Sequence, residues 1–413
     1  SEADAPGRDR AGKRIALPAH PVRRPRRVIP VLRLSAFYFA YLAALGAFSP
    51  YFPLWLHDRG LSAAAISGVM SLWYGTRIVS PLVWGHLALH SPRPVRWLRI
   101  GALAALACFA GFLLPLPLAG IVLAMAGYSF FYNALMPQFD AITLSHLHQR
   151  PHDYSRIRAW GSIGFLLTAL LLGSLFERIG IAWLPAVMLP MFGLLALCAW
   201  LNDYGPGLHA GDVARESLLA GLRRPGVVAF IAAAFLMQVA HGPYYVFFSL
   251  FLEDNGYRAS ALGGFWAIGV AAEIVMFWFA ARLLARFGGV RLIRLCLMVA
   301  ALRFAVTGLL PQSLPMMLLA QLSHAFTFGL FHAACMQRIA RLFPGRLLGQ
   351  GQGLLYGLGS GVGGVAGSLI AGWAWSHGGG LLAFSVAAVA AALGAALAFA
   401  TMRPGASISP SSE

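Results

Sequence analysis

The sequence predicts an all-α polytopic membrane protein with twelve transmembrane helices in two six-helix halves. Hydrophobic residues make up 59% of the chain and charged residues only 11%, which leaves too little polar surface for an ordinary soluble globule. Apolar runs of about 20 residues, the length that crosses roughly 30 Å of hydrocarbon, recur along the chain after Arg33. Basic residues alternate with these runs, and the second half of the chain repeats features of the first.

The predicted spans are joined mostly by short loops. The first six are 34–56, 62–84, 97–115, 119–143, 157–176 and 181–201. The second six are 227–252, 261–285, 291–310, 314–340, 348–375 and 380–402. The longest polar connection, a cytoplasmic loop at 202–225, separates an N-terminal bundle at 34–201 from a C-terminal bundle at 226–403. Residues 1–33 are predicted to be a basic, flexible cytoplasmic tail, and residues 404–413 a C-terminal tail.

The net charge of +17 is explained by membrane topology rather than by nucleic acid binding. With both termini in the cytoplasm, 26 of the 31 Lys and Arg residues fall on the cytoplasmic side. Such a bias follows the positive-inside rule and predicts cytoplasmic N and C termini. Arg77 and Arg303 are the basic residues that this topology places at membrane depth.

The two halves are predicted to be repeats. At a constant offset of 196 residues, small and acidic residues match in one register, as Asp58 with Asp254, Gly60 with Gly256, and Gly68 with Gly264. The same offset relates Arg77 to Glu273, so the repeats place opposite charges at equivalent positions. Duplicated halves are typical of alternating-access carriers, in which the solute binds between the halves near the bilayer midplane.

Ionisable residues inside the spans are the first candidate functional groups. Of the 14 Asp and Glu residues, Asp140 and Glu273 lie well inside hydrophobic spans, where an unpaired charge costs several kcal/mol. We expect both to face a central cavity. Arg303 and His324 can form a polar cluster with Glu273. In such a cluster the protonation of Glu273 can switch as the neighbouring groups move. The alternatives are a structural ion pair of Glu273 with Arg77 and a packing role for His324.

The segment HGPYY is the second candidate. His241, Tyr244 and Tyr245 lie beside the helix-weakening Pro243 and offer hydrogen-bonding and aromatic surface to a solute, with simple aromatic packing as the alternative. The four cysteines lie in apolar segments without CxxC spacing, which predicts neither disulfides nor a metal site. Without a clustered nucleophile or a cofactor loop, the sequence predicts no cofactor and no enzyme.

Four segments of the chain carry a family resemblance: YFAYLAALGAFSPYFPLWLHDRGLS, MPQFDAITL, DYSRIRAWGSIGF and AHGPYYVFFSLFLEDNGYRASALGGFWAIGVAAEI. Together they resemble the phenylpropionate permease branch of the major facilitator superfamily. The resemblance runs from about Leu34 to Met402 and extends more distantly to lactose permease and other oligosaccharide:proton symporters. It implies the major facilitator fold and secondary active transport.

The resemblance also implies roles for particular residues. Asp140 falls where lactose permease has its fourth-helix glutamate, and Arg158 falls where it has the fifth-helix arginine that holds sugar. Glu273, Arg303 and His324 fall on the polar residues of that family's eighth, ninth and tenth helices.

The chain departs from the lactose permease pattern in three places. Thr327 replaces the tenth-helix glutamate that carries the proton, so proton translocation would need Glu273 or Asp140. Phe165 replaces the tryptophan that stacks on galactose, which weakens a sugar assignment. The loop motif after the second helix keeps Gly85 but has Leu89 in place of an aspartate. This change leaves the predicted fold intact and does not decide how the transporter is gated.

The leading hypothesis is proton-coupled uptake of an aromatic or other small carboxylate. Arg158 would bind the carboxylate, with Asp140 as its partner when the site is empty. The other expected solute-binding residues are Trp160, Phe165, His241, Tyr244 and Tyr245. The expected proton-coupling residues are Glu273, Arg303, His324 and Arg77.

The expected partners are a small-molecule solute, protons and the lipid bilayer, with no nucleic acid and with the monomer as the functional unit. The expected location is the bacterial cytoplasmic (inner) membrane. The same cavity chemistry permits symport of a sugar or nucleoside, and drug or metabolite efflux is a further alternative. A membrane enzyme or a non-transporting receptor fits less well, because we find no catalytic cluster and no folded extramembrane domain.

Overall fold

The computed structural model describes residues 29–147, 153–205 and 218–403, and within these ranges it is helical, with no strand. The predicted all-α class is therefore confirmed. The described residues from Val31 onward belong to one compact unit. The predicted tails up to residue 28 and from residue 404, and residues 206–217 of the predicted central loop, lie outside the described residues. The division into two six-helix domains stays a prediction.

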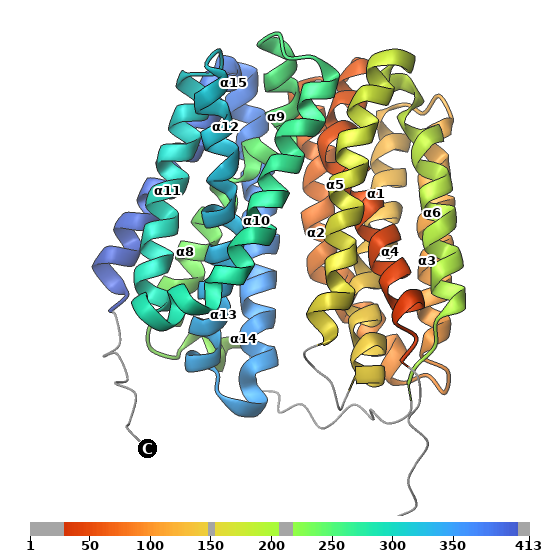
Figure 1. Cartoon of the computed structure of the whole chain (residues 1–413), viewed down its shortest axis with the longest axis horizontal. Helices are drawn as coiled ribbons and strands as arrows, with labels where there is room; N and C mark the ends of the chain where they lie inside the picture. Colours follow the sequence, from red (N-terminus) through yellow and green to blue (C-terminus); the bar gives the residue numbers. More distant parts are fainter. Residues whose placement is uncertain (1–28, 148–152, 206–217, 404–413) are drawn as a thin grey trace, which may run out of the picture. The chain divides into compact units, whose positions relative to one another are not determined.

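The helices follow one another along the chain, and most of the described connections between them are short (Figure 1). The α-helices of the first half are α1 (Val31–Asp58), α2 (Ala63–Leu89), α3 (Val95–Ala110), α4 (Leu118–Leu147), α5 (Asp153–Ile179) and α6 (Leu184–Leu201). Those of the second half are α7 (Leu218–Leu222), α8 (Val227–Ala240), α9 (Gly242–Asp254), α10 (Ala259–Phe287), α11 (Gly289–Leu309), α12 (Leu314–Leu322), α13 (Phe331–Leu342), α14 (Leu348–Leu354) and α15 (Gly363–Thr401). Short 3-10 helices lie at Gly111–Leu113, Ile181–Trp183 and Gly345–Leu347, and π-helices at Ala325–Leu330 and Leu355–Val362.

Ten stretches of the described chain are long and apolar enough to cross a membrane. One of them, Leu348–Thr401, has 54 residues and would measure about 80 Å as a single straight helix, far more than a bilayer needs. Its backbone leaves the helical conformation at Gly378 and Gly379, where Gly379 has φ +59°, so the stretch contains two helices. The count of twelve stays a prediction, because it also requires the 27-residue α2 to cross.

Several predicted spans are interrupted where their backbone hydrogen bonding changes. The predicted span 227–252 is two helices, α8 and α9, which meet at His241 and Gly242 just before Pro243. Proline cannot donate the backbone hydrogen bond that would continue the helix. The predicted span 314–340 contains the π-helix Ala325–Leu330 directly after His324. Such π-segments occur frequently at functional sites, and both breaks lie at predicted site residues.

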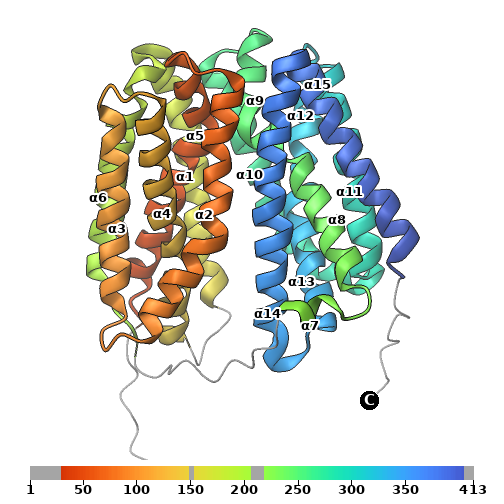
Figure 2. The same cartoon turned by 180° about the vertical axis from the view of Figure 1, so that it is seen from behind.

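Helices α1–α6 gather on one side, and α7–α15 gather on the other (Figures 1 and 2). Glycines allow close packing inside the first group, because a Cβ on Gly164 would lie 2.5 Å from the backbone oxygen of Phe39. The two groups contact each other along α5 with α10 and along α2 with α15. There too the approach is close: Gly263 lies against the backbone of Ala169, and Gly364 lies against the ring of Tyr74.

The loops before α2 and α10 have the same backbone geometry at positions that lie 196 residues apart in the sequence. Gly60 has φ +78° and Gly256 has φ +81°. The Gly60 N–H donates to the His57 carbonyl at 2.8 Å, and the Gly256 N–H donates to the Glu253 carbonyl at 2.9 Å. A left-handed conformation at both positions explains why glycine occurs in both loops.

The packing of α1 on α5 predicts a selective effect of Gly164→Leu. The added side chain must displace the α1 backbone at Phe39, so we expect the free energy of unfolding to fall by about 1–3 kcal/mol. Gly193→Leu is the matched control, because a Cβ there meets no atom within 4 Å. Thermal unfolding of the purified variants checks the difference, and equal melting temperatures would contradict it.

Candidate functional site

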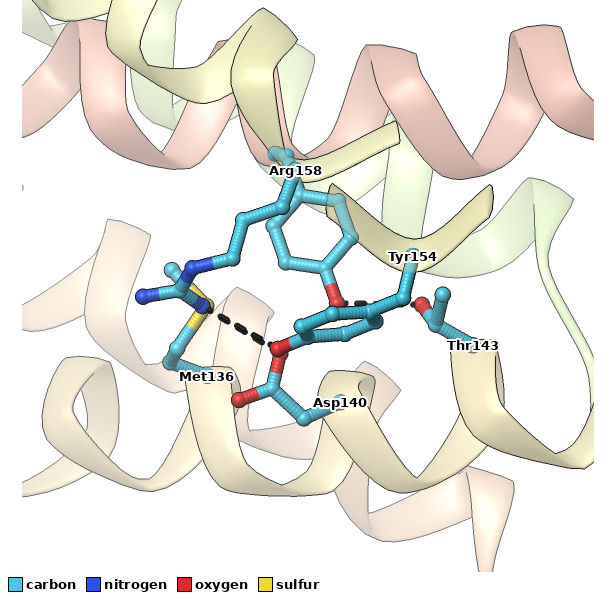
Figure 3. Close-up of polar contacts among 6 residues, drawn as sticks. Met136, Asp140, Thr143, Tyr154 and Arg158 are labelled. Atoms are coloured by element: carbon cyan, nitrogen blue, oxygen red, sulfur yellow. Dashed lines mark hydrogen bonds and ion pairs between the residues drawn. The ribbon is translucent and has the colours of Figure 1, made fainter. Parts of the chain in front are cut away.

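The first site cluster joins Asp140 of α4 to Arg158 of α5 (Figure 3). Nη1 of Arg158 lies 3.4 Å from Oδ1 of Asp140. The hydroxyl of Tyr38 donates to the same Oδ1 at 2.7 Å, and the hydroxyl of Tyr154 donates to it at 2.9 Å. The side chains of Asp140 and Arg158 are 29% and 43% exposed, so the cluster is open enough to meet a solute. One carboxylate oxygen therefore collects donors from α1 and α5.

Helical spacing brings these groups together. Asp140 and Thr143 lie three residues apart on one face of α4, and Tyr154 and Arg158 lie four residues apart on one face of α5. The hydroxyl of Tyr38 also lies 3.1 Å from Oγ1 of Thr143. A phenol has one proton to donate, so Tyr38 donates to Asp140 and accepts from Thr143.

Arg158 keeps part of its guanidinium free for another ligand. Its hydrogen bonds to described residues all come from Nη1, which faces Asp140, the Tyr154 hydroxyl and Sδ of Met136. Nε and Nη2 make no hydrogen bond to the described chain. A guanidinium presents five donors in a planar fork that matches a carboxylate, so this remaining edge suits an anionic group.

The second cluster lies in the other group of helices and is centred on Arg303 of α11. This side chain is almost fully buried, with 2% exposure. Nη1 donates to Oγ1 of Thr327 at 2.8 Å and lies 3.0 Å from Nδ1 of His324. The guanidinium carbon lies 4.4 Å from the centre of the Tyr244 ring. Among the described residues no carboxylate forms an ion pair with Arg303, so its charge is held by a ring face, a hydroxyl and an imidazole.

The contact with Arg303 fixes the tautomer of His324. A guanidinium only donates, so Nδ1 of His324 must accept and the ring proton must sit on Nε2. This Nε2 lies 4.0 Å from Oε2 of Glu273 on α10, longer than a direct hydrogen bond. Arg303, His324 and Glu273 therefore form an ordered series in which the protonated imidazole nitrogen lies 4.0 Å from the carboxylate.

The HGPYY residues border this second cluster. Nδ1 of His241 donates to the Met237 carbonyl at 2.8 Å, and the hydroxyl of Tyr244 donates to Oε1 of Gln321 at 3.1 Å. The ring centre of Tyr245 lies 6.5 Å from that of Tyr74 on α2, so this residue faces the other group of helices. Tyr244 and His241 pack their rings at 6.3 Å, which means that they take part in aromatic packing as well.

A cavity that is partly open to solvent adjoins the second cluster, and its empty space, open solvent included, measures about 480 Å³. Its polar lining includes Gln238, His241, Thr327, His332 and Tyr356. Nε2 of His241 is buried and makes no hydrogen bond to the described chain. Since Nδ1 holds the ring proton, this Nε2 is a vacant acceptor beside the cavity.

Three of the predicted site residues lie apart from both clusters. Arg77 is exposed, and within the described chain no carboxylate lies within ion-pair distance of it. The ion pair considered between Arg77 and Glu273 is therefore not formed in this structure. Trp160 is 49% exposed and makes no ring contact with the described aromatic residues. Phe165 is partly buried, and its backbone packs closely on Gly46 of α1.

The sequence analysis missed several polar residues of these clusters. Tyr38 and Tyr154 hold Asp140, and the four-residue spacing of Tyr154 from Arg158 was a usable signal. The hydroxyl of Tyr356 lies 3.4 Å from Nε2 of His332 at the cavity. His332 lies about two helical turns after His324, a spacing that repeats the same helix face. Within the described residues, no group of three His, Cys, Asp or Glu side chains is placed to hold a metal ion.

Comparison with known families gives a match that covers most of the chain. The model of the MFS_1 like family matches residues 31–386. A probable 3-phenylpropionic acid transporter of Escherichia coli is 28% identical over 74% of this chain and 81% of its own length. A maltose permease of Geobacillus stearothermophilus is 28% identical over 86% of this chain and 91% of its own length. A putative nucleoside transporter of Escherichia coli is 23% identical over 78% of this chain and 79% of its own length.

Solved structures share the fold at low sequence identity. The nucleoside transporter NupG aligns with a TM-score of 0.78 at 17% identity, over 90% of this chain and 98% of its own. A peptide transporter, POT, in complex with sulfate aligns with a TM-score of 0.72 at 13% identity, over 90% of this chain and 93% of its own. At these identities the likeness shows the arrangement of helices and leaves the solute undecided.

The Asp140 cluster predicts energetic coupling between its two charged members. Asp140→Ala, Arg158→Ala and the double variant form a cycle in which we expect a coupling of about 1 kcal/mol, kept small by the partial exposure of both side chains. Arg156, which is 85% exposed on the same helix, is the matched control, and Arg156→Ala should show no coupling to Asp140→Ala. Unfolding free energies measure both cycles, and equal coupling in the two would contradict the cluster.

Proposed function

Because the chain belongs to the MFS_1 like family and is a multi-pass membrane transporter of that type, we propose that it takes up a small aromatic carboxylate with protons. The proposed setting is the bacterial inner membrane, with the monomer as the transporting unit. The observation that carries the proposal is the free guanidinium edge of Arg158 beside the carboxylate of Asp140. Asp140 is the partner of Arg158 when the site is empty, and the remaining edge of the guanidinium is free to bind the solute.

Charge balance favours an anionic solute over a neutral one. The charged residues that the sequence places deep in the spans are Asp140 and Glu273 against Arg77 and Arg303, and Arg158 lies at the start of the fifth span. Arg158 has a carboxylate partner, whereas Arg303 has no ion pair among the described side chains. An uncompensated cation in a low-dielectric interior attracts an anion. A carboxylate solute would supply the negative charge that Arg303 lacks among the described side chains.

Aromatic surface near both clusters supports an aromatic solute. Tyr244 is buried against Arg303, and Tyr245 faces Tyr74 across the boundary between the two helix groups. At the first cluster the rings are those of Tyr38 and Tyr154, whose hydroxyls hold Asp140, whereas Phe165 and Trp160 lie on α5 but apart from both clusters. A ring that stacks on such faces while its carboxylate pairs with an arginine is held at both ends.

Glu273 is the proposed proton carrier. Its side chain is 16% exposed, and Nε2 of His324, which carries the ring proton, lies 4.0 Å from its Oε2. A deprotonated Glu273 attracts this N–H, and protonation removes the attraction, so the contact between α10 and the region of His324 depends on the bound proton. Arg303 keeps His324 in the required tautomer, and the exposed Arg77 is the proposed alternative partner of Glu273 in another conformation.

Transport then follows from movement of the two helix groups against each other. The contacts of α5 with α10 and of α2 with α15 are the surfaces along which they separate. Arg158 lies on α5 and Glu273 lies on α10, so solute binding and protonation act on the two sides of one interface. Coupling results because both events change the charges at that interface.

The second candidate function is proton symport of a sugar or nucleoside. It is favoured by the similarity to a maltose permease and to a putative nucleoside transporter. Hydroxyl-rich solutes can also hydrogen-bond Asp140 and Arg158 in the same cluster.

Proton coupling predicts a specific defect for Glu273→Gln. The amide cannot exchange a proton, so we expect acid-driven accumulation of the solute in proteoliposomes to be abolished while counterflow exchange persists. Glu253→Gln is the matched control, because Glu253 is exposed at the end of α9 and should retain accumulation. Undiminished accumulation by the Glu273→Gln variant would remove this residue from the mechanism.

The solute class predicts selective ligand stabilisation. A ligand at 100 times its Kd stabilises the native state by about 2.7 kcal/mol, so 3-phenylpropionate should raise the melting temperature of the purified protein. Arg158→Gln should lose most of this shift, because a neutral amide cannot pair with the carboxylate. Maltose and uridine are the comparison ligands, and a shift with either of them but not with the acid would favour the second candidate function.

A further inference from the structure

The strongest unassigned feature is a contact between the two helix groups at the end of the molecule where α5 finishes and α10 begins. We call this the outer end, because the predicted topology places the loops before α2 and α10 outside the cytoplasm. Oε2 of Glu177, in the last turn of α5, accepts the backbone N–H of Ser260 at 3.2 Å.

This backbone N–H belongs to the first turn of α10. The first N–H groups of a helix have no partner inside the helix and are normally satisfied by the side chain of the N-cap residue. The N-cap of α10 is Arg258, whose side chain makes no such bond and has no acceptor to make one. Glu177 supplies that acceptor from α5, and its negative charge also suits the positive end of the helix dipole.

The equivalent helix in the first half is capped in the ordinary way. At the 196-residue offset Arg258 corresponds to Ser62, the N-cap of α2. Oγ of Ser62 accepts the N–H of Ala65 at 3.3 Å. Since the two loops share the same backbone geometry, the difference between them is the cap: α2 provides its own, and α10 takes one from the opposite helix group.

The surroundings of Glu177 show that this cap exists only while the outer end is closed. A Cβ on Gly173 would lie 2.6 Å from the carbonyl oxygen of Ala259, and the hydroxyl of Tyr51 donates to the Ala169 carbonyl at 2.6 Å. The backbones of α5 and α10 are thus in close contact beside the cap. Any separation of the two helices removes the carboxylate from the first turn of α10.

The ion pair at this position contributes less than the cap. Nη1 of Arg258 lies 4.0 Å from Oε1 of Glu177, and the Arg258 side chain is 83% exposed. The attraction in a solvent-exposed pair at this distance is screened by water, and ordering two flexible side chains costs conformational entropy. The backbone N–H of Ser260, in contrast, has no acceptor from its own N-cap residue to replace Glu177.

We propose that Glu177 is a positioning residue for transport: from α5 it caps the N-terminus of α10 across the interface between the two helix groups. Because α10 has this cap only while the outer end is closed, the cap stabilises the outward-closed state. The proposal requires that the two helix groups separate at the outer end during transport. It requires neither proton coupling nor a particular solute, so failure of the Glu273 or phenylpropionate tests leaves it standing.

The test measures how often the outer end is open. Nitroxide labels at Arg178→Cys on α5 and Leu314→Cys on α12, both exposed, report the separation in a background that lacks the native Cys108, Cys198, Cys296 and Cys335. The loop before α12 is fixed to the loop before α10, because the hydroxyl of Tyr257 donates to the Pro311 carbonyl at 2.8 Å. Loss of a typical cap corresponds to roughly a fivefold rise in the ratio of open to closed molecules in Glu177→Ala. Glu177→Gln, which keeps an acceptor but no charge, should give a smaller rise.

Restoring a local cap separates a gating role from a merely structural one. In Glu177→Ala with Arg258→Ser, α10 regains a serine cap like that of Ser62, so the melting temperature should recover while the excess of open molecules persists. Ser62→Ala is the matched control and should lower the melting temperature without changing the label separation. An unchanged distance distribution in Glu177→Ala, or a return to the wild-type distribution on adding Arg258→Ser, would overturn the proposal.

Discussion

Charged groups inside a membrane must find partners within the protein, because no water is available to solvate them, and this constraint organises the centre of the molecule. The two central arginines satisfy it differently. Arg158 pairs with Asp140, which is also held by two tyrosine hydroxyls. Arg303 is held by the Tyr244 ring, the Thr327 hydroxyl and an imidazole nitrogen. Arg158 is therefore balanced in charge, and Arg303 is held in place without an ion pair to any described residue.

The same absence of water restricts the backbone, so irregular backbone is tolerated only where protein or a cavity surrounds it. The break before Pro243 and the π-helix after His324 are two such places, and both border the second cluster. The cavity beside them is lined by His241 and Thr327, one from each irregular segment. The departures from regular helix thus coincide with the position at which polar side chains face a cavity.

The two helix groups, α1–α6 and α7–α15, carry different chemistry. The first carries a carboxylate and arginine pair, and the second carries Glu273, His324 and Arg303 in series. The outer loops share their backbone geometry, yet α2 has its own cap and α10 takes one from α5. The two outer loops are therefore alike in their backbone and differ in how the helix after each loop is capped.

Composition and hydropathy determined the all-helical membrane class, because apolar runs long enough to cross a bilayer have few other uses. Residue identity singled out Asp140, Arg158, Glu273, Arg303 and His324, since ionisable groups are rare in such runs. Only the tertiary structure decided which of them meet: it left Arg77 exposed, placed Tyr38 of α1 on Asp140, and brought Glu177 to the start of α10. Spacing along one helix is local and can be read from the sequence, whereas contacts between helices depend on the rotation and depth of each helix, which are set by packing against neighbours far away in the chain.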